Sequence, residues 1–280
     1  MKRKLALLLL FALLPAAMCS ARGTSENCGG EAAVPIIMYH HMSPKPQLLG
    51  TYTISPDSFE TDLKWLCSHG YHAVFVSELV SFVRGESKLP EKSVVISFDD
   101  AQESFFEYAL PLLEKYGMCA SLAVIGECAD QFTNEPDHNL DYSYMDWEEI
   151  KRASESGAVE LVSHTYALHS LKPRCGCAKL PGEDENAYRE MLHGDLSRLN
   201  TGFESAGLSA PEVFAYPYGS LCGEAEEVLH SLGFTAALTC DGHINRLRRG
   251  DTDILYRLGR FNRPGKAETW KFFSQTVGLK

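Results

Sequence analysis

Short apolar runs alternate with amphipathic segments along most of the chain. The apolar runs are rich in β-branched residues and lie at 34–39, 73–76, 94–98, 120–125, 159–162, 213–216 and 235–238. The segments between them have helical periodicity and lie at 59–68, 104–116, 147–156, 185–205, 224–232 and 269–276. This alternation predicts an α/β fold built of βα units around a parallel sheet. Because the strands are apolar almost throughout, both faces of the sheet must be covered, which fits a doubly wound sheet or a barrel equally well.

The N-terminus follows a different pattern. Three basic residues at 2–4 precede an apolar run at 5–17, and small residues follow up to Ala21. This is typical of a secretory signal peptide, and the run is too short to span a membrane comfortably. We therefore expect residues 1–21 to be a signal peptide and the mature protein to be secreted or associated with the cell envelope.

The remainder divides into an expected linker at 22–33 and one domain at 34–280. Cys19 also lies where a lipoprotein signal would place its lipidated cysteine, although the methionine before it fits that signal poorly. An association with the membrane is therefore expected only if Cys19 is lipidated.

Composition and charge narrow the classes of function. The 280 residues are 45% hydrophobic and 22% charged, as in a globular protein and unlike a disordered or fibrous one. The formal net charge of −11 becomes more negative once residues 1–21 are removed, because that segment carries basic residues and no acid. An acidic exported protein is poorly suited to bind nucleic acid, so a neutral or weakly charged substrate is favoured.

Nine cysteines are present, and eight remain after Cys19. Disulfide bonds are permitted in an exported chain but are not required by this count. Cys67, Cys119 and Cys240 lie in apolar segments, where we expect small buried hydrophobic side chains.

Two adjacent carboxylates, Asp99 and Asp100, directly follow the apolar run at 94–98. Such a pair is electrostatically unfavourable without a cation nearby. Because consecutive side chains on a strand point to opposite sides, we expect different tasks for the two, one holding a metal ion and the other moving a proton. The start of a helix, where Asp caps backbone N–H groups, is the competing interpretation.

Two histidines, His164 and His169, follow the run at 159–162. On a helix they would lie about 140° apart, so a loop must bring them together. Two imidazoles and one carboxylate form a metal centre with positions left open for water and substrate, as hydrolytic zinc sites require. With 10 histidines in the chain, a pair that is close by chance is the alternative.

Two other strand ends carry candidate groups. The run at 213–216 leads into a Pro-Tyr-Gly turn centred on Tyr218, whose backbone N–H groups are candidates to face a ligand, although a plain turn also explains the motif. The run at 34–39 delivers His40 and His41 to its end, where a histidine is a reasonable proton donor or a chance filler.

In order and spacing, the segments 97–100, 163–169 and 216–219 resemble the first three motifs of the polysaccharide deacetylase family, the NodB-like carbohydrate esterases. The similarity covers most of the chain after residue 34. Each motif alone is short, but three in order, each closing a predicted strand, are specific. The family fold is a distorted (β/α) barrel of about seven repeats, so the resemblance favours a barrel over a doubly wound sheet.

The resemblance implies a role for five residues. Asp99 corresponds to the catalytic base, and Asp100, His164 and His169 correspond to the ligands of one divalent metal ion, with zinc the expected metal. The backbone N–H of Tyr218 corresponds to part of the oxyanion hole. Most members space the two histidines four residues apart, and the spacing of five resembles the subgroup that deacetylates the poly-N-acetylglucosamine of biofilms.

Three departures from the family pattern matter. The glycine that usually follows the acid pair is Ala101, and the arginine usually found two residues before the proline of the third motif is Ala215. The segment 272–277 near the C-terminus lacks the Leu-x-His that supplies a general acid.

The segment 34–40 resembles that missing strand, moved to the N-terminus as it is in the biofilm subgroup. A barrel tolerates circular permutation because its first and last strands are neighbours. The resemblance to the biofilm subgroup favours His40 over His41 as the general acid. The stretch 255–261, at an expected strand end, offers Arg260 as the substitute for the missing arginine.

The resemblance therefore implies a metal-dependent hydrolase that removes acetyl groups from an N-acetylated cell-surface or extracellular polysaccharide. Two alternatives remain open. The first is an O-acetyl esterase acting on xylan-like glycans, which would use the same chemistry on a different bond. The second is a catalytically inactive carbohydrate-binding homologue, which the missing arginine suggests.

Overall fold

The protein is built around one curved parallel sheet. The computed structural model describes residues 29–280, so the expected signal peptide and Cys19 lie outside the described residues. Its strands are β1 (Glu31–Val34), β2 (Ile36–Tyr39), β3 (His41–Met42), β4 (Thr53–Ile54), β5 (His72–Ala73), β6 (Ser93–Phe98), β7 (Ala120–Val124), β8 (Val159–Ser163), β9 (Val213–Ala215), β10 (Ala236–Leu238), β11 (Asn245–Arg248) and β12 (Phe261–Asn262).

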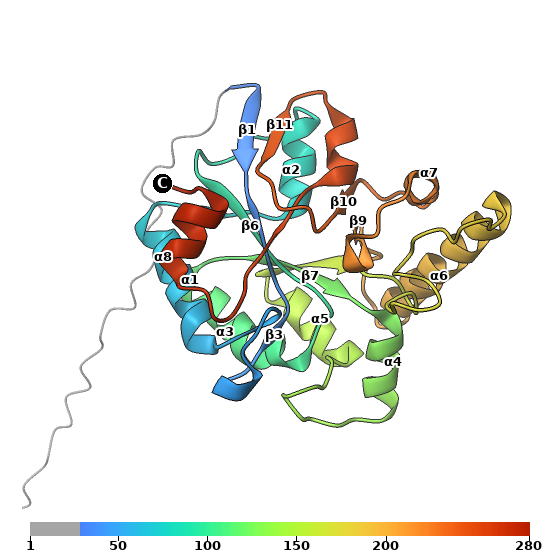
Figure 1. The fold of residues 1–280 in the computed structure, drawn as a ribbon, viewed down its shortest axis with the longest axis horizontal. Helices are drawn as coiled ribbons and strands as arrows, with labels where there is room; N and C mark the ends of the chain where they lie inside the picture. Colours follow the sequence, from blue (N-terminus) through green and yellow to red (C-terminus); the bar gives the residue numbers. More distant parts are fainter. Residues whose placement is uncertain (1–28) are drawn as a thin grey trace, which may run out of the picture.

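Helices cover the outside of this sheet (Figure 1). They are α1 (Pro56–Ser68), α2 (Val76–Val83), α3 (Leu110–Tyr116), α4 (Gly126–Asn134), α5 (Trp147–Glu155), α6 (Glu185–Ser205), α7 (Gly223–Ser231) and α8 (Thr269–Lys271). Short 3-10 helices span Pro46–Leu48, Pro217–Gly219 and Thr252–Arg257, and π-helical turns at Phe105–Ala109 and Phe272–Val277 adjoin α3 and α8. No helix within residues 29–280 is both long and apolar enough to cross a membrane.

The strand order of the main sheet is β10-β9-β8-β7-β6-β2-β12, and neighbouring strands along it are parallel. The predicted α/β fold with a parallel sheet is therefore confirmed. The sheet curls, and the segment 258–262 bridges its two ends. At β10, the Leu258 N–H donates to the Ala237 carbonyl over 3.0 Å, and at the other end β12 pairs with β2. The C-terminal ends of the strands consequently gather around one opening.

The sequence predicts one strand at 34–39, but the structure has two strands there, β1 and β2. Pro35 interrupts the run, because proline has no N–H for a strand ladder. The part before Pro35, β1, pairs antiparallel with β11 in a separate ribbon, and β2 enters the main sheet between β6 and β12. Since β1 begins at Glu31, an ordered strand occupies the end of the segment 22–33 that we expected to be a linker.

The run at 73–76 also differs from the prediction, because only His72 and Ala73 form a strand and α2 begins at Val76. The carboxylate of Glu160, on β8, accepts hydrogen bonds from the N–H groups of Val76 and Ser77, both over 3.0 Å. A side chain 84 positions away thus satisfies the start of α2, which no local pattern could indicate.

A buried ion pair joins the C-terminal part of the chain to α1 and β2. Arg263 and Asp62 are almost fully buried, and two guanidinium nitrogens donate to the carboxylate over 2.9 and 3.0 Å. Hydroxyl groups of Tyr39, at the end of β2, and Thr269 donate to the same carboxylate. Since Tyr39 immediately precedes His40, this network also fixes the strand that delivers His40.

Breaking this pair should destabilise the fold. The change Arg263→Met leaves the Asp62 carboxylate buried without its cation, so we expect the free energy of unfolding to fall by about 3–5 kcal/mol. The double change Arg263→Met/Asp62→Leu removes both charges and should recover much of that loss. Urea-induced unfolding followed by circular dichroism measures both effects. A double variant as unstable as the single one would contradict this account.

Candidate active site

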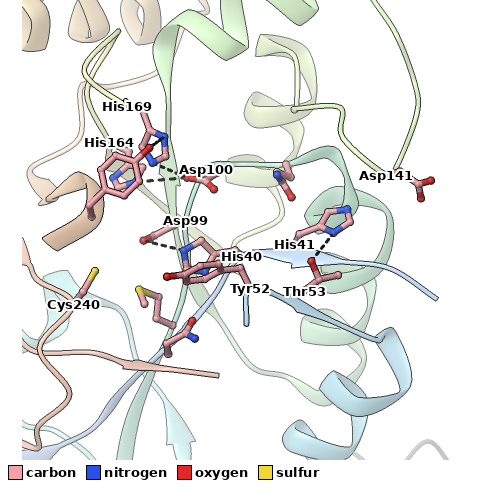
Figure 2. Close-up of a pocket in the computed structure, with 14 residues that line it drawn as sticks. His40, His41, Tyr52, Thr53, Asp99, Asp100, Asp141, His164, His169 and Cys240 are labelled. Atoms are coloured by element: carbon pink, nitrogen blue, oxygen red, sulfur yellow. Dashed lines mark hydrogen bonds and ion pairs between the residues drawn. The ribbon is translucent and has the colours of Figure 1, made fainter. Parts of the chain in front are cut away.

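Polar side chains gather in a cavity of about 590 Å³ at the C-terminal ends of the strands. Three of its residues directly follow a strand of the main sheet: His40 follows β2, Asp99 follows β6 and His164 follows β8. Figure 2 shows Asp100 facing His164 and His169, with Asp99 and His40 beside them. The cavity therefore brings together groups from positions 38 to 262 of the chain.

Asp100, His164 and His169 form a compact cluster. Oδ1 of Asp100 lies 3.6 Å from Nε2 of His164 and 3.3 Å from Nε2 of His169. Oδ1 is buried and has no hydrogen-bond partner among the described residues. Nδ1 of His164 lies 2.8 Å from the Ala215 carbonyl, an acceptor that places the proton on Nδ1 and leaves Nε2 free for a metal.

The cluster fits a divalent ion. Atoms that bind zinc at 2.0–2.2 Å in a tetrahedron lie about 3.3–3.6 Å apart, which agrees with both distances from Asp100. Burial raises the pKa of Asp100 to about 6, and it lowers the pKa of His164 to about 4. The imidazole is therefore neutral at pH 7, as a metal ligand must be, and the carboxylate is ionised there although it lacks a cationic partner.

Asp99 has the opposite environment. Its two oxygens accept hydrogen bonds from Nη1 and Nη2 of Arg260 over 2.5 and 2.9 Å, and both side chains are buried. Burial alone would raise the pKa of Asp99, but the Arg260 guanidinium outweighs it, with help from His164, and holds that pKa well below its usual range.

The position of Arg260 differs from the expected strand end. Residues Thr252–Arg257 form a 3-10 helix, and Arg260 stands immediately before β12. From there its guanidinium bonds to Asp99, which directly follows β6, and to the Thr239 carbonyl after β10. A guanidinium thus faces the carboxylate of Asp99 although the position of Ala215, on β9, carries none.

The two adjacent histidines face different parts of the cavity (Figure 2). Nε2 of His40 lies 3.9 Å from Oδ2 of Asp99, and its buried Nδ1 has no partner among the described residues. The ring nitrogens of His41 lie 3.3 Å from the Thr53 hydroxyl and 2.8 Å from the Leu140 carbonyl. His41 therefore lines the same cavity but is occupied by bonds that hold its wall.

Tyr218 lies in the turn after β9 with a left-handed backbone, at φ 58°. Its ring packs on His169 with centroids 4.8 Å apart, and its hydroxyl lies 3.4 Å from Nδ1 of that histidine. The described non-glycine residues with positive φ are Asp100, Ala101, Thr165 and Tyr218. All four belong to these strand-end segments, and such strain gathers where a functional arrangement requires it.

Several residues of the cavity were missed in the sequence. Tyr52, Gln102, Asp141 and Asn262 line it but come from loops or from β12, without a motif of their own. Cys240 was expected to be buried, and this is wrong: it is exposed and lines the cavity. Cys240 follows β10, so its place just after an apolar run was the available signal.

Comparisons with known proteins agree with this geometry. A family model described as Polysaccharide deacetylase matches residues 86–237, more than half of the chain. The matched part contains Asp99, Asp100, His164, His169 and Tyr218, whereas His40 and Arg260 lie outside it on opposite sides.

Similar proteins include poly-β-1,6-N-acetyl-D-glucosamine N-deacetylases from two bacteria. That of Escherichia coli K12 is 26% identical over 224 residues, covering 73% of this chain and 33% of the relative. That of Staphylococcus aureus MSSA476 is 30% identical over 182 residues, covering 65% of this chain and 59% of the relative. The matched part thus spans about a third of the length of the E. coli relative and less than two thirds of the length of the S. aureus relative.

Among solved structures, IcaB from Ammonifex degensii superposes with a TM-score of 0.72 at 25% identity. The match covers 89% of this chain and 98% of that one. Most of the described fold is therefore shared with that protein.

Zinc binding at the Asp100 cluster should depend on pH. The raised pKa of Asp100, about 6, means that protons compete with the metal below pH 6, whereas His164 is already neutral there. The Kd for Zn²⁺ should be nearly constant from pH 7.5 to 6.5 and rise about tenfold per unit below pH 6. Isothermal titration calorimetry measures this, with Asp100→Ala as the control that identifies the signal. A Kd that stays flat down to pH 5 would exclude Asp100 as a ligand.

Proposed function

The chain belongs to the polysaccharide deacetylase family, and from this premise we propose that it is a metal-dependent hydrolase that removes acetyl groups from an N-acetylated polysaccharide. The observation that carries the proposal is that Asp100, His164 and His169 line one cavity together with Asp99, whose carboxylate is paired with the buried Arg260. Poly-β-1,6-N-acetylglucosamine, the substrate named for its relatives, is the first candidate polymer.

In this proposal Asp100, His164 and His169 hold one divalent ion, with zinc the expected metal. When bound, such an ion supplies an acidified water and polarises the acetyl carbonyl. The free Nε2 of His164 and the orphaned Oδ1 of Asp100 support this ligand set.

Asp99 acts as the general base. The Arg260 guanidinium keeps its carboxylate ionised over the working pH range, so an oxygen of Asp99 is always able to accept the proton of the attacking water. The same bidentate pair orients the carboxylate. Arg260 is therefore a positioning residue in this scheme and does not contact the substrate.

The other two groups act on the acetyl oxygen and on the leaving nitrogen. The backbone N–H of Tyr218, in the turn after β9, stabilises the negative charge that develops on the carbonyl oxygen. His40, on the other side of Asp99, donates a proton to the sugar nitrogen as the C–N bond breaks. An amine leaves poorly without this proton. The products are acetate and a free amino sugar.

We further propose that the barrel is a circularly permuted (β/α)₇ form. The first strand of the main sheet in the chain, β2, lies between β6, which carries the acid pair, and β12, the last strand. His40 thus lines the cavity from near one end of the chain, and Arg260, from near the other end, pairs with Asp99, which lines it. We place the catalytic domain at 34–280, with export through residues 1–21 to the cell envelope or the medium.

The inactive carbohydrate-binding alternative rested on the missing arginine at Ala215. Arg260 now supplies a guanidinium to Asp99, so that argument no longer favours an inactive protein. The O-acetyl esterase differs only in the bond attacked and is tested directly below.

The substrate class can be tested by measuring acetate release. We expect the purified protein with Zn²⁺ to release acetate from β-1,6-linked N-acetylglucosamine oligomers, and to act at least ten times more slowly on acetylated xylan. Asp99→Asn is the matched control, since it should keep the metal and lose 10² to 10⁴-fold in rate. Faster release from xylan would favour the esterase, and no release from any polymer would favour the binding protein.

The role of His40 predicts a dependence on the leaving group. His40→Ala should reduce the rate of amide hydrolysis by about 10² to 10⁴-fold at unchanged metal content. The leaving group of an activated acetyl ester needs no proton, so the variant should hydrolyse such an ester at a rate close to that of the unchanged protein. His41→Ala is the control, because any loss there should affect both substrates alike. Equal losses on amide and ester in His40→Ala would show that the acid is another residue.

A further inference from the structure

A second group of potential metal ligands lies apart from the Asp100 cluster. Glu103, His138 and Glu149 each offer one ligand atom, and these atoms lie within 4.8 Å of one another. They come from the segment after β6, the loop between α4 and α5, and the first turn of α5. We propose that this triad is a second divalent-cation site, which binds a zinc-like ion and fixes one wall of the cavity.

Glu103 provides the strongest observation for a missing cation. The residue is only 6% exposed, and its Oε2 is buried without a hydrogen-bond partner among the described residues. Its other oxygen lies 2.6 Å from Nδ1 of His138. Burying a carboxylate oxygen without a hydrogen-bond partner is unfavourable, and a bound cation would offset that cost.

Glu149 adds a second carboxylate in an unfavourable place. Burial raises its pKa, and the negative charges of Asp146 and Glu103 raise it further. One oxygen of Glu149 accepts a hydrogen bond from the Asp146 N–H, which holds the side chain back over the start of α5. Two carboxylates crowded around one imidazole are stabilised by a positive charge between them.

The donor set defines the kind of ion. One imidazole with two carboxylates suits borderline divalent ions such as zinc, whereas calcium prefers an all-oxygen site. The side chain of His138 is 67% exposed, so the site is open to solvent and water can complete the coordination. The competing possibility is a protonated His138, because its hydrogen bond to Glu103 raises its pKa.

An ion at this triad would hold the loop that borders the cavity. The Glu103 N–H donates to the Ser143 carbonyl over 2.8 Å, which ties this loop to the segment after β6. Between His138 and Ser143 in the same loop, the Leu140 carbonyl bonds to His41, and Asp141 lines the cavity. The ion would thus join the wall of the cavity to the strand end that carries Asp99 and Asp100.

Metal stoichiometry tests the proposal independently of activity. The metal-free protein should bind two Zn²⁺ per chain, His138→Ala one, and Asp100→Ala/His164→Ala one. Combining the three changes should leave none. Because His138 is mostly exposed, its replacement leaves the core intact. His193→Ala, which removes an exposed histidine on α6, is the matched control and should keep both ions.

Calorimetry with Zn²⁺ and with Ca²⁺ should give an affinity for zinc at the second site that falls at least tenfold in His138→Ala, and Glu103→Gln should produce the same fall. Zinc should also slow hydrogen exchange of residues 135–145 in Asp100→Ala/His164→Ala. Three results would each overturn the proposal. The first is binding of one zinc by the unchanged protein, which would leave His138 as a protonated partner of Glu103. The others are a stoichiometry that His138→Ala does not alter and equal binding of calcium and zinc.

Discussion

The bidentate ion pair between Asp99 and Arg260 is the interaction on which the site depends. Both side chains are buried, so neither charge is tolerable without the other. Arg260 also donates from Nε to the Thr239 carbonyl over 2.9 Å, and it belongs to the segment 258–262 that bridges the two ends of the sheet. The side chain that fixes the carboxylate therefore also anchors the segment that completes the curl.

This pairing gives two neighbouring carboxylates different properties. Asp99 has its cation supplied by the protein, and its pKa is held low. Asp100 has none, and burial raises its pKa to about 6. Environments that separate the pKa values of two acids are how one site assigns them different tasks. In the proposed mechanism, Asp100 accordingly holds the metal ion and Asp99 accepts a proton.

A second buried arginine repeats the device three residues later. Arg263 pairs with Asp62 on α1 and, through that carboxylate, with Tyr39 on β2. The C-terminal segment thus uses one arginine to fix the acid after β6 and another to fix the strand before His40. The proposed cation at Glu103 would stabilise the segment that follows β6. Positions of the reacting groups are in this way set by charges buried around them.

The sequence by itself determined where the reactive groups stand, because strand periodicity and strand-end polarity are local properties: the runs ending before Asp99, His164 and Tyr218 are strands β6, β8 and β9. The tertiary structure alone decided which distant partners meet. Arg260 lies 161 positions from Asp99 in the chain, and Glu160 caps α2 from 84 positions away. His138 and Glu103 are separated by 35 positions. Such pairings leave no periodic signal in the chain, because they depend on how the sheet curls and where its loops return.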